Sequence, residues 1–293
     1  MAGAGFKTSN MGTSSCDFDH GDTRTEEELS DMWQKVKTIY ENASDCKLHT
    51  GDENAWSDDV VRPLLQLAIE IHGGDRWKLH NVKSQSIDPQ YLSTIDAPTP
   101  ANASRTRVVD RRADYALAYS HRSPRYSDLY VRLKAAKQSE VGPTLAQWTR
   151  QSAVFSGFEV KSPLGTQHEA EQQISIWIAA SLRKKQELAS IARVPPFQRA
   201  DMVEPVFTIV GHHHFVYFAW PRKHPVSCEW GTQVLGPHSR LTFNTLDLHG
   251  VFQLLRFYGE VLKYAADEGP NGYWGRFFGK VLNQLAASRP DNN

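Results

Sequence analysis

The chain lacks the features that mark several special classes of protein. It has three cysteines in 293 residues, scattered and odd in number, so neither a disulfide scaffold nor a cysteine zinc site is expected. No apolar run approaches the length of about 18 residues that a membrane-spanning helix needs. The N-terminal stretch MAGAGFKTSN has no apolar signal-peptide core. We therefore expect an intracellular protein, cytoplasmic or nuclear, that does not associate with membranes.

An excess of charge of one sign is also missing. The 33 basic residues balance 33 acidic ones, so nucleic-acid binding would need a local positive strip rather than a global field. With 40% apolar and 23% charged residues, the composition is that of a globular protein. Residues 1–25 are poor in large apolar side chains and are predicted to form a disordered tail. Residues 26–293 are predicted to form one domain.

Hydrophobic periodicity and turn signals predict alternating helices and strands. Helices are expected at 25–43, from Ser57 as N-cap to Gly73-Gly74, and at 167–189. Strands are expected at 82–87, 113–119, 153–161, 206–210 and 215–220, with an edge strand within 226–234. An insertion with some helix is placed around 120–150, and a helical extension from about 246. This order predicts an α/β fold with a mixed sheet between the two central helices.

One strand carries an unusual pair of charged residues. Side chains two apart on a strand share a face, so Glu159 and Lys161 point together while Phe158 and Val160 point to the other side. Buried charges are costly unless they are paired or bind a cation. Asp114 holds a similar position at the start of the preceding strand. If the two strands are neighbours, Asp114 and Glu159 can converge on one Mg²⁺, an ion that prefers carboxylate oxygens.

Taken alone, the acid-x-lysine triplet is weak evidence, because Asp45-Cys46-Lys47 repeats it in a polar loop. Glu159 and Lys161 could form an ion pair on a half-exposed strand. Asp114 could accept backbone hydrogen bonds at a strand end. The succession of helix, strand, strand with Asp, strand with Glu-x-Lys and helix favours the metal site.

At this point the chain resembles the PD-(D/E)XK nuclease superfamily, and more closely a nuclease-like domain family found mainly in fungi. The resemblance rests on three segments, 112–119, 155–163 and 169–177, and extends loosely to Trp220. It implies a restriction-endonuclease-like αβββαβ core with helices added at both ends. It also implies a metal-dependent nuclease, with Mg²⁺ or Mn²⁺ as cofactor and nucleic acid, DNA favoured, as partner.

The resemblance assigns roles to residues of the central strands. Asp114 and Glu159 would bind the metal together with the backbone carbonyl of Val160, and Lys161 would position the attacking water. Ala113 stands where the family motif usually has proline. That departure makes the match less specific.

Other residues would assist. Glu171 and Gln173 match an auxiliary acid and a glutamine of the superfamily, and Glu70 is a candidate extra acid on the first helix. Gln173 is placed on the core side of its helix because it lies four residues before Trp177. Arg111 and Arg112, at the end of a basic cluster before Asp114, would contact phosphates.

Two other classes of function stay open from the sequence. One is a catalytically idle nuclease-fold module that binds nucleic acid or protein. The other is a glycosidase that uses Asp114 and Glu159 as paired acids, which would leave Lys161 without a role. Trp148, Trp177, Trp220 and Trp230 are interpreted as core or rim packing residues rather than base-stacking platforms.

Overall fold

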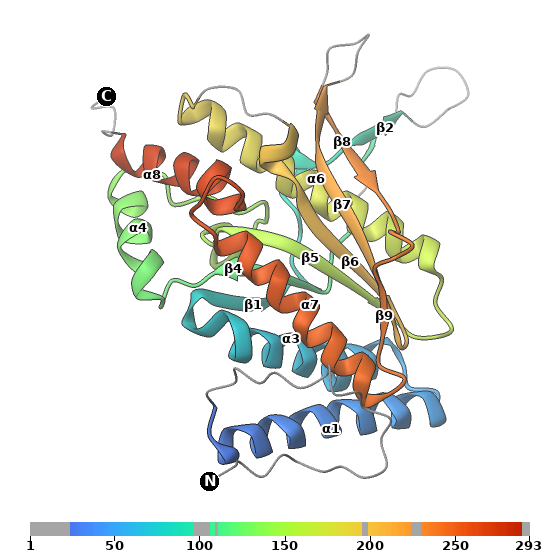
Figure 1. Ribbon diagram of the computed structural model, residues 1–293. Coiled ribbons are helices and arrows are strands. Elements are labelled where there is room, and N and C mark those ends of the chain that lie inside the picture. The colour runs from blue at the N-terminus through green and yellow to red at the C-terminus, as the bar shows by residue number, and fades with distance from the viewer. Residues whose placement is uncertain (1–23, 97–105, 109–110, 195–198, 224–229, 289–293) are drawn as a thin grey trace, which may run out of the picture.

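A central sheet with helices on both faces organises the protein (Figure 1). The computed structural model describes residues 24–96, 106–108, 111–194, 199–223 and 230–288. Residues 1–23, most of the predicted tail, lie outside this range. Thr25 is the N-cap of the first helix, where its side chain and that of Glu28 form a capping box. None of the helices in the described ranges is long and apolar enough to cross a membrane.

The sheet has the order β1-β4-β5-β6-β7-β8, and β9 pairs with β7. Its strands are β1 (Trp77–Asn81), β4 (Tyr115–Tyr119), β5 (Val154–Lys161), β6 (Glu204–Val210), β7 (His213–Lys223), β8 (Trp230–Leu235) and β9 (Thr242–Asn244). β5 pairs antiparallel with β4 and parallel with β6, so the sheet is mixed. The strands β2 (Thr94–Asp96) and β3 (Thr106–Val108) form a separate hairpin.

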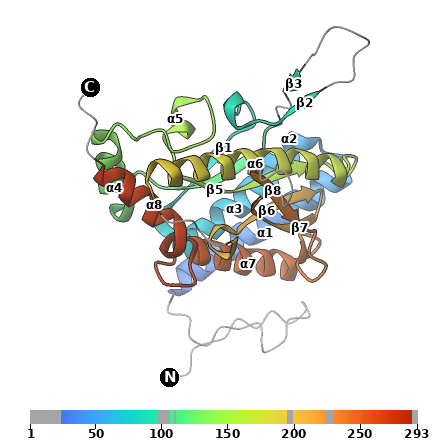
Figure 2. The same cartoon turned by 90° about the horizontal axis from the view of Figure 1, so that it is seen from above.

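Helices cover the two faces of the sheet unequally. They are α1 (Glu26–Leu48), α2 (Glu53–Ala55), α3 (Arg62–Ala68), α4 (Pro124–Ala135), α5 (Gln147–Arg150), α6 (Gln167–Ile191), α7 (Leu248–Ala266) and α8 (Gly279–Ala287). Figure 2 shows α6 along one face and α3, α7 and α1 on the other. Each side therefore has its own apolar core.

Glycine explains how closely α6 approaches β5. A Cβ atom at Gly157 would lie 2.6 Å from Cδ1 of Trp177, so the indole packs directly on the strand backbone. The strand face that contains Gly157, Glu159 and Lys161 is therefore turned toward α6. Phe158 faces the other core, where its ring stacks on Phe207 with 4.8 Å between ring centroids.

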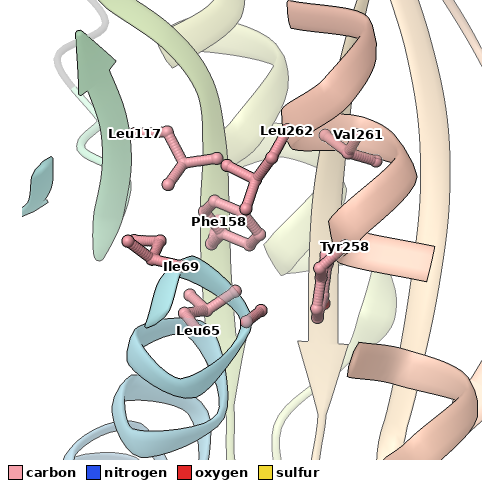
Figure 3. A pocket seen from close by; sticks show the side chains of 8 residues that line it. Leu65, Ile69, Leu117, Phe158, Tyr258, Val261 and Leu262 are labelled. Carbon is pink, nitrogen blue, oxygen red and sulfur yellow. The ribbon is translucent and has the colours of Figure 1, made fainter. Parts of the chain in front are cut away.

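A small apolar pocket lies in that second core, between α3, β4, β5 and α7 (Figure 3). Leu65, Leu117, Phe158, Tyr258 and Leu262 are among the residues that line it. Because its walls are apolar and lie across the sheet from Glu159, the pocket is a feature of core packing.

The predicted fold class is confirmed, but the first strand is displaced. Residues 82–87 form a loop, of which only Ile87 makes an isolated bridge, to Thr144. The strand is instead β1, which pairs with β4. Val82 and Ile87 are buried, but they are buried as ends of a loop that covers α6's side of the sheet. The apolar residues at the two ends of this loop are the reason that the sequence pattern predicts a strand here.

The second helix also begins earlier than predicted. Its N-cap is Asp52, whose side chain accepts a hydrogen bond from the Ala55 N–H, rather than Ser57. Ser57 lies inside the helix, and its hydroxyl donates to the Tyr115 hydroxyl at 3.0 Å. The helical path continues through the π-helical turns 56–61 and 69–73 and ends at Gly74, with φ 57°. The predicted glycine stop is confirmed.

The remaining predicted segments are found where expected. The insertion around 120–150 contains α4 and α5, and the C-terminal part contains α7, the π-helical turn Trp274–Phe278 and α8. In the predicted edge strand 226–234, residues 224–229 lie outside the described range, and β8 begins at Trp230.

A buried ion pair ties the C-terminal part to the sheet. Lys185 Nζ on α6 lies 2.5 Å from Glu204 Oε1 on β6, and both side chains are buried. Ser181 Oγ accepts a second hydrogen bond from Lys185 at 3.1 Å. The Tyr273 hydroxyl and the Ser156 N–H donate to the Glu204 carboxylate. Partners on every side offset the cost of burying these charges.

Candidate metal centre

The pairing of β4 with β5 brings the predicted acids together. Tyr115 pairs with Phe158, and the Asp114 N–H donates to the Phe158 carbonyl at 2.9 Å. The Val160 N–H donates to the Asp114 carboxylate at 2.7 Å. Because side chains alternate along each strand, Asp114 and Glu159 both point to the α6 side.

A third carboxylate completes an acidic cluster. Glu53, Asp114 and Glu159 each offer one oxygen, and these oxygens all lie within 4.8 Å of one another. Asp114 and Glu159 are 5% and 2% exposed, and Glu53 is partly exposed. Glu53 stands at the first position of α2, directly after the N-cap Asp52. The sequence reasoning missed Glu53 because it started this helix too late, although Asp52 was an available start signal.

Lys161 lies within the same cluster. Its Nζ is 2.9 Å from Glu159 Oε1 and 3.0 Å from Glu53 Oε2, and its side chain is buried. The stem packs against the backbone, since a Cβ atom at Gly165 would lie 2.8 Å from Lys161 Cβ. The ammonium group is thus held at a fixed place between two acids.

Burial makes the negative charges of the cluster unstable without a further cation. It raises the pKa of Glu159 to about 8, with the charge of Asp114 adding to the rise. Burial likewise raises the pKa of Asp114 to about 6, against the hydrogen bond from Val160. Burial alone would lower the pKa of Lys161, but Glu159 and Glu53 outweigh it and raise that pKa. The single positive charge of Lys161 does not balance the charges of three carboxylates.

The donor set fits a divalent metal ion. Glu159 Oε2 is a buried atom without a hydrogen-bond partner among the described residues. Such an atom is costly in a folded protein unless something binds it. Carboxylate oxygens are the ligands that Mg²⁺ and Mn²⁺ prefer. Glu53, Asp114 and Glu159 are therefore the residues that could hold the ion. The predicted role of the Val160 carbonyl stays a prediction.

The two predicted helical residues have different surroundings. Gln173 is partly buried on α6, and its Oε1 atom has no hydrogen-bond partner among the described residues. Glu171 instead accepts hydrogen bonds from the Tyr217 hydroxyl at 2.7 Å and from Gln167 Nε2 at 3.2 Å. Glu171 is outside the acidic cluster, so the structure gives it a hydrogen-bonding role between α6 and β7.

Glu70 is not brought to the cluster. Its carboxylate pairs with Lys35 Nζ at 2.6 Å on the surface, where the Glu70 side chain is 59% exposed. Glu53, not Glu70, is the acid that the N-terminal helical segment contributes. Arg111 is exposed, and Arg112, two residues before Asp114, donates to Ser86 Oγ at 3.1 Å.

A second lysine, Lys83, stands beside the cluster. Its Nζ lies 3.4 Å from Asn54 Oδ1, 4.0 Å from Asp58 Oδ1 and 5.6 Å from the centre of the Tyr115 ring. Its charge opposes the rise in the pKa of Asp114. The sequence does not predict Lys83 as a site residue, because its pattern places Lys83 in a strand over residues 82–87 rather than in a loop.

Comparison with known proteins agrees with this geometry. A family model described as the PD-(D/E)XK nuclease superfamily matches residues 5–274. The chain therefore belongs to the PD-(D/E)XK nuclease superfamily, as the three segments predicted. This membership supports a nuclease-type function, and nucleases of the superfamily generally depend on divalent metals. No curated protein and no solved structure matches the chain.

Proposed function

We propose that this protein is a metal-dependent nuclease that hydrolyses phosphodiester bonds of nucleic acid, with DNA as the favoured substrate and Mg²⁺ or Mn²⁺ as cofactor. The observation that carries the proposal is the cluster of Glu53, Asp114 and Glu159, to which Lys161 is hydrogen-bonded. One buried oxygen of the cluster, Glu159 Oε2, has no partner among the described residues. A glycosidase would need no such ammonium group between its acids.

Each residue of the cluster has a role in this proposal. Glu53, Asp114 and Glu159 would hold the metal ion, which supplies a nucleophile from water and stabilises the negative charge that develops at phosphorus. Lys161 offers a fixed positive charge and a hydrogen-bond donor at the same point, so it can orient the attacking water. Its contacts with two of the acids fix that orientation before substrate binds.

The cations around the cluster suit a polyanionic substrate. The charge of Lys83 acts on Asp114, and Arg111 and Arg112 lie three and two residues before Asp114 in the chain. Contacts from lysine and arginine to phosphates position a nucleic acid without reading its sequence. Gln173 on α6, whose Oε1 atom has no partner in the part of the chain that the structure describes, is the further residue that we propose to lie near the substrate.

The direct test is cleavage of plasmid and of single-stranded DNA with Mg²⁺ or Mn²⁺, with a chelator as the blank. We expect Glu159→Ala and Lys161→Ala each to reduce cleavage by at least about 100-fold, as loss of charge stabilisation in a transition state does. The matched controls are Glu70→Ala and Lys35→Ala, which break a surface pair. Cleavage by all four variants at the wild-type rate would refute the proposal.

Calorimetric titration with Mg²⁺ separates this proposal from an idle module. Wild-type protein should bind the ion at millimolar concentration or below, and Glu159→Ala should not. Binding of nucleic acid without metal binding or cleavage would instead identify a module that keeps the fold for recognition alone.

A further inference from the structure

Trp148 on α5 is exposed and yet held in place. Its side chain is 59% exposed, and its indole N–H donates to Nδ1 of His80 at 3.1 Å. The indole stacks on the His121 ring with 5.9 Å between centroids and 25° between planes. His121 in turn stacks on Tyr130 at 3.5 Å and 14°. We call Trp148, His121 and Tyr130 the aromatic ledge.

The ledge is not explained by core packing. Trp177 and Trp220 are buried, as the sequence interpretation expected, whereas Trp148 leaves more than half of its surface to solvent. A large aromatic side chain fixed by a hydrogen bond and a stack loses little entropy when a flat ligand binds to it. Such a preformed surface suits a planar partner.

Trp148, the exposed member of the ledge, lies on the same side of the sheet as the acidic cluster. His80 pairs with Ala116, which is two residues from Asp114 along β4, and Ala116 belongs to the core on the α6 side. Figure 2 shows α5 on that side of the sheet, above β1. Two residues along a strand and one step across it place the backbone of His80, the residue that holds Trp148, about 8 Å from the backbone of Asp114.

Neutral rings and nearby cations define the chemistry of the ledge. Burial lowers the pKa of His80 to about 4 and also lowers that of His121, so both rings are uncharged near neutral pH. Lys78 and Arg122 are exposed beside them on β1 and after β4. An apolar aromatic surface edged by positive charge matches a nucleobase attached to its phosphate.

We propose that the aromatic ledge stacks an unpaired base of a single-stranded substrate whose scissile phosphate lies at the acidic cluster. This inference rests on the proposed nuclease function. In a duplex, each internal base is already covered by its neighbours, so only a single strand or a frayed end offers a free face. The ledge would therefore favour single-stranded over double-stranded nucleic acid.

The test measures binding in a chelating buffer, so that it does not depend on cleavage. The probes are a labelled oligodeoxythymidylate of about 20 nucleotides, longer than the ~4–16 that one domain covers, and its duplex with oligodeoxyadenylate. Because one base would lose its stacking partner, Trp148→Leu should weaken single-strand binding at least about fivefold. Trp148→Phe should retain most of the affinity, and duplex binding should not change.

Trp230→Leu is the matched control, since Trp230 is 58% exposed on the edge strand β8. A second readout is tryptophan emission, which the oligonucleotide should quench in the wild type and quench less in Trp148→Phe. This readout serves even if the leucine variant fails to fold.

The possible results separate the two proposals. Equal single-strand affinity in wild type and both Trp148 variants, with unchanged quenching, would overturn the ledge and leave cleavage untouched. A Trp148-dependent preference for the single strand would support the ledge even if no cleavage were observed. Equal loss in Trp148→Leu and Trp230→Leu would also overturn it, because the effect would not be specific to this site.

Discussion

Glu159 shows how one residue concentrates the chemistry of the site. One of its oxygens pairs with Lys161, while the other is buried without a partner among the described residues. Glu53 and Asp114 approach the same point from a different helix and a different strand. Three carboxylates held together in this way repel one another when they are charged. A divalent cation bound between them would remove this repulsion.

Glu53 provides a test of the cluster at single-residue scale. We expect Glu53→Gln to weaken Mg²⁺ binding at least about tenfold, because it removes one charged ligand and the negative charge of the second partner of Lys161. Calorimetric titration measures the change. The matched control is Glu70→Gln, since Glu70 lies on the same helical segment but pairs with Lys35. Equal affinity in the two variants would exclude Glu53 from the site.

The residues that the sequence revealed are those linked by local geometry. Alternation along a strand is sufficient to place Glu159 and Lys161 on one face, and Asp114 on the neighbouring strand follows from the helix and strand order. Glu53 lies 108 positions before Lys161 in the chain. Asp52 marks Glu53 as the first residue of a helix, but no local pattern shows that this end of the helical segment, rather than the position of Glu70, reaches the strands.

Among the elements, β5 and α6 depend on each other for position. Gly157→Ala would place a Cβ atom 2.6 Å from Trp177 Cδ1 and 3.1 Å from Ile174 Cδ1, so α6 must shift away. Overpacking of this kind lowers the free energy of unfolding by about 1–3 kcal/mol. Urea unfolding measures the loss, and cleavage should also fall because Glu159 lies two residues further along the strand.

Gly231→Ala is the control for that substitution. Gly231 is also a strand glycine, but the nearest atom to its added Cβ, the Arg222 carbonyl oxygen, would be 3.8 Å away. Its stability should stay within about 0.5 kcal/mol of the wild type. Similar losses in both variants would mean that the contact with Trp177 is not what limits position 157.

The sequence predicts the helices and strands correctly where the hydrophobic periodicity is strong, and wrongly at β1 and the loop that follows it. The central strands and α6 have long apolar or glycine-marked runs, and their boundaries agree within a few residues. β1 was missed because Lys78 and Asn81 are exposed and only Trp77 and His80 are buried, which is a weak strand pattern. The loop 82–87, which follows β1, has buried apolar residues at both ends, and its sequence pattern therefore predicts a strand.

For the whole molecule, His214 links stability to pH. It is buried between β7 and α7, where its Nδ1 lies 2.8 Å from the Tyr258 hydroxyl. Burial, with a smaller effect from the neighbouring His213 and His212, lowers its pKa to about 3. When the pH is below about 6.5, the ordinary pKa of histidine, His214 is protonated in the unfolded chain but stays neutral in the folded protein. The free energy of unfolding therefore falls as the pH falls from about 6.5 toward 3.

The size of this effect can be isolated by substitution. Between pH 7 and pH 5 the histidine should remove about 2 kcal/mol of stability, at about 1.4 kcal/mol for each pH unit below 6.5. We expect His214→Asn, which keeps a polar group toward Tyr258, to lose that much less over the same interval. Urea unfolding of both proteins at the two pH values gives the comparison. An identical pH dependence would show that His214 titrates normally.

The buried pair of Lys185 and Glu204 has a consequence for how the protein is made. Both residues are synthesised well before Tyr273, whose hydroxyl donates to the Glu204 carboxylate. Lys185 also lies over the ring of Phe278, 5.2 Å from its centre. In a nascent chain that ends before Tyr273, these aromatic side chains cannot yet cover Lys185 and Glu204. The core around the pair should therefore be completed only after the segment that contains Tyr273 and Phe278 has been synthesised.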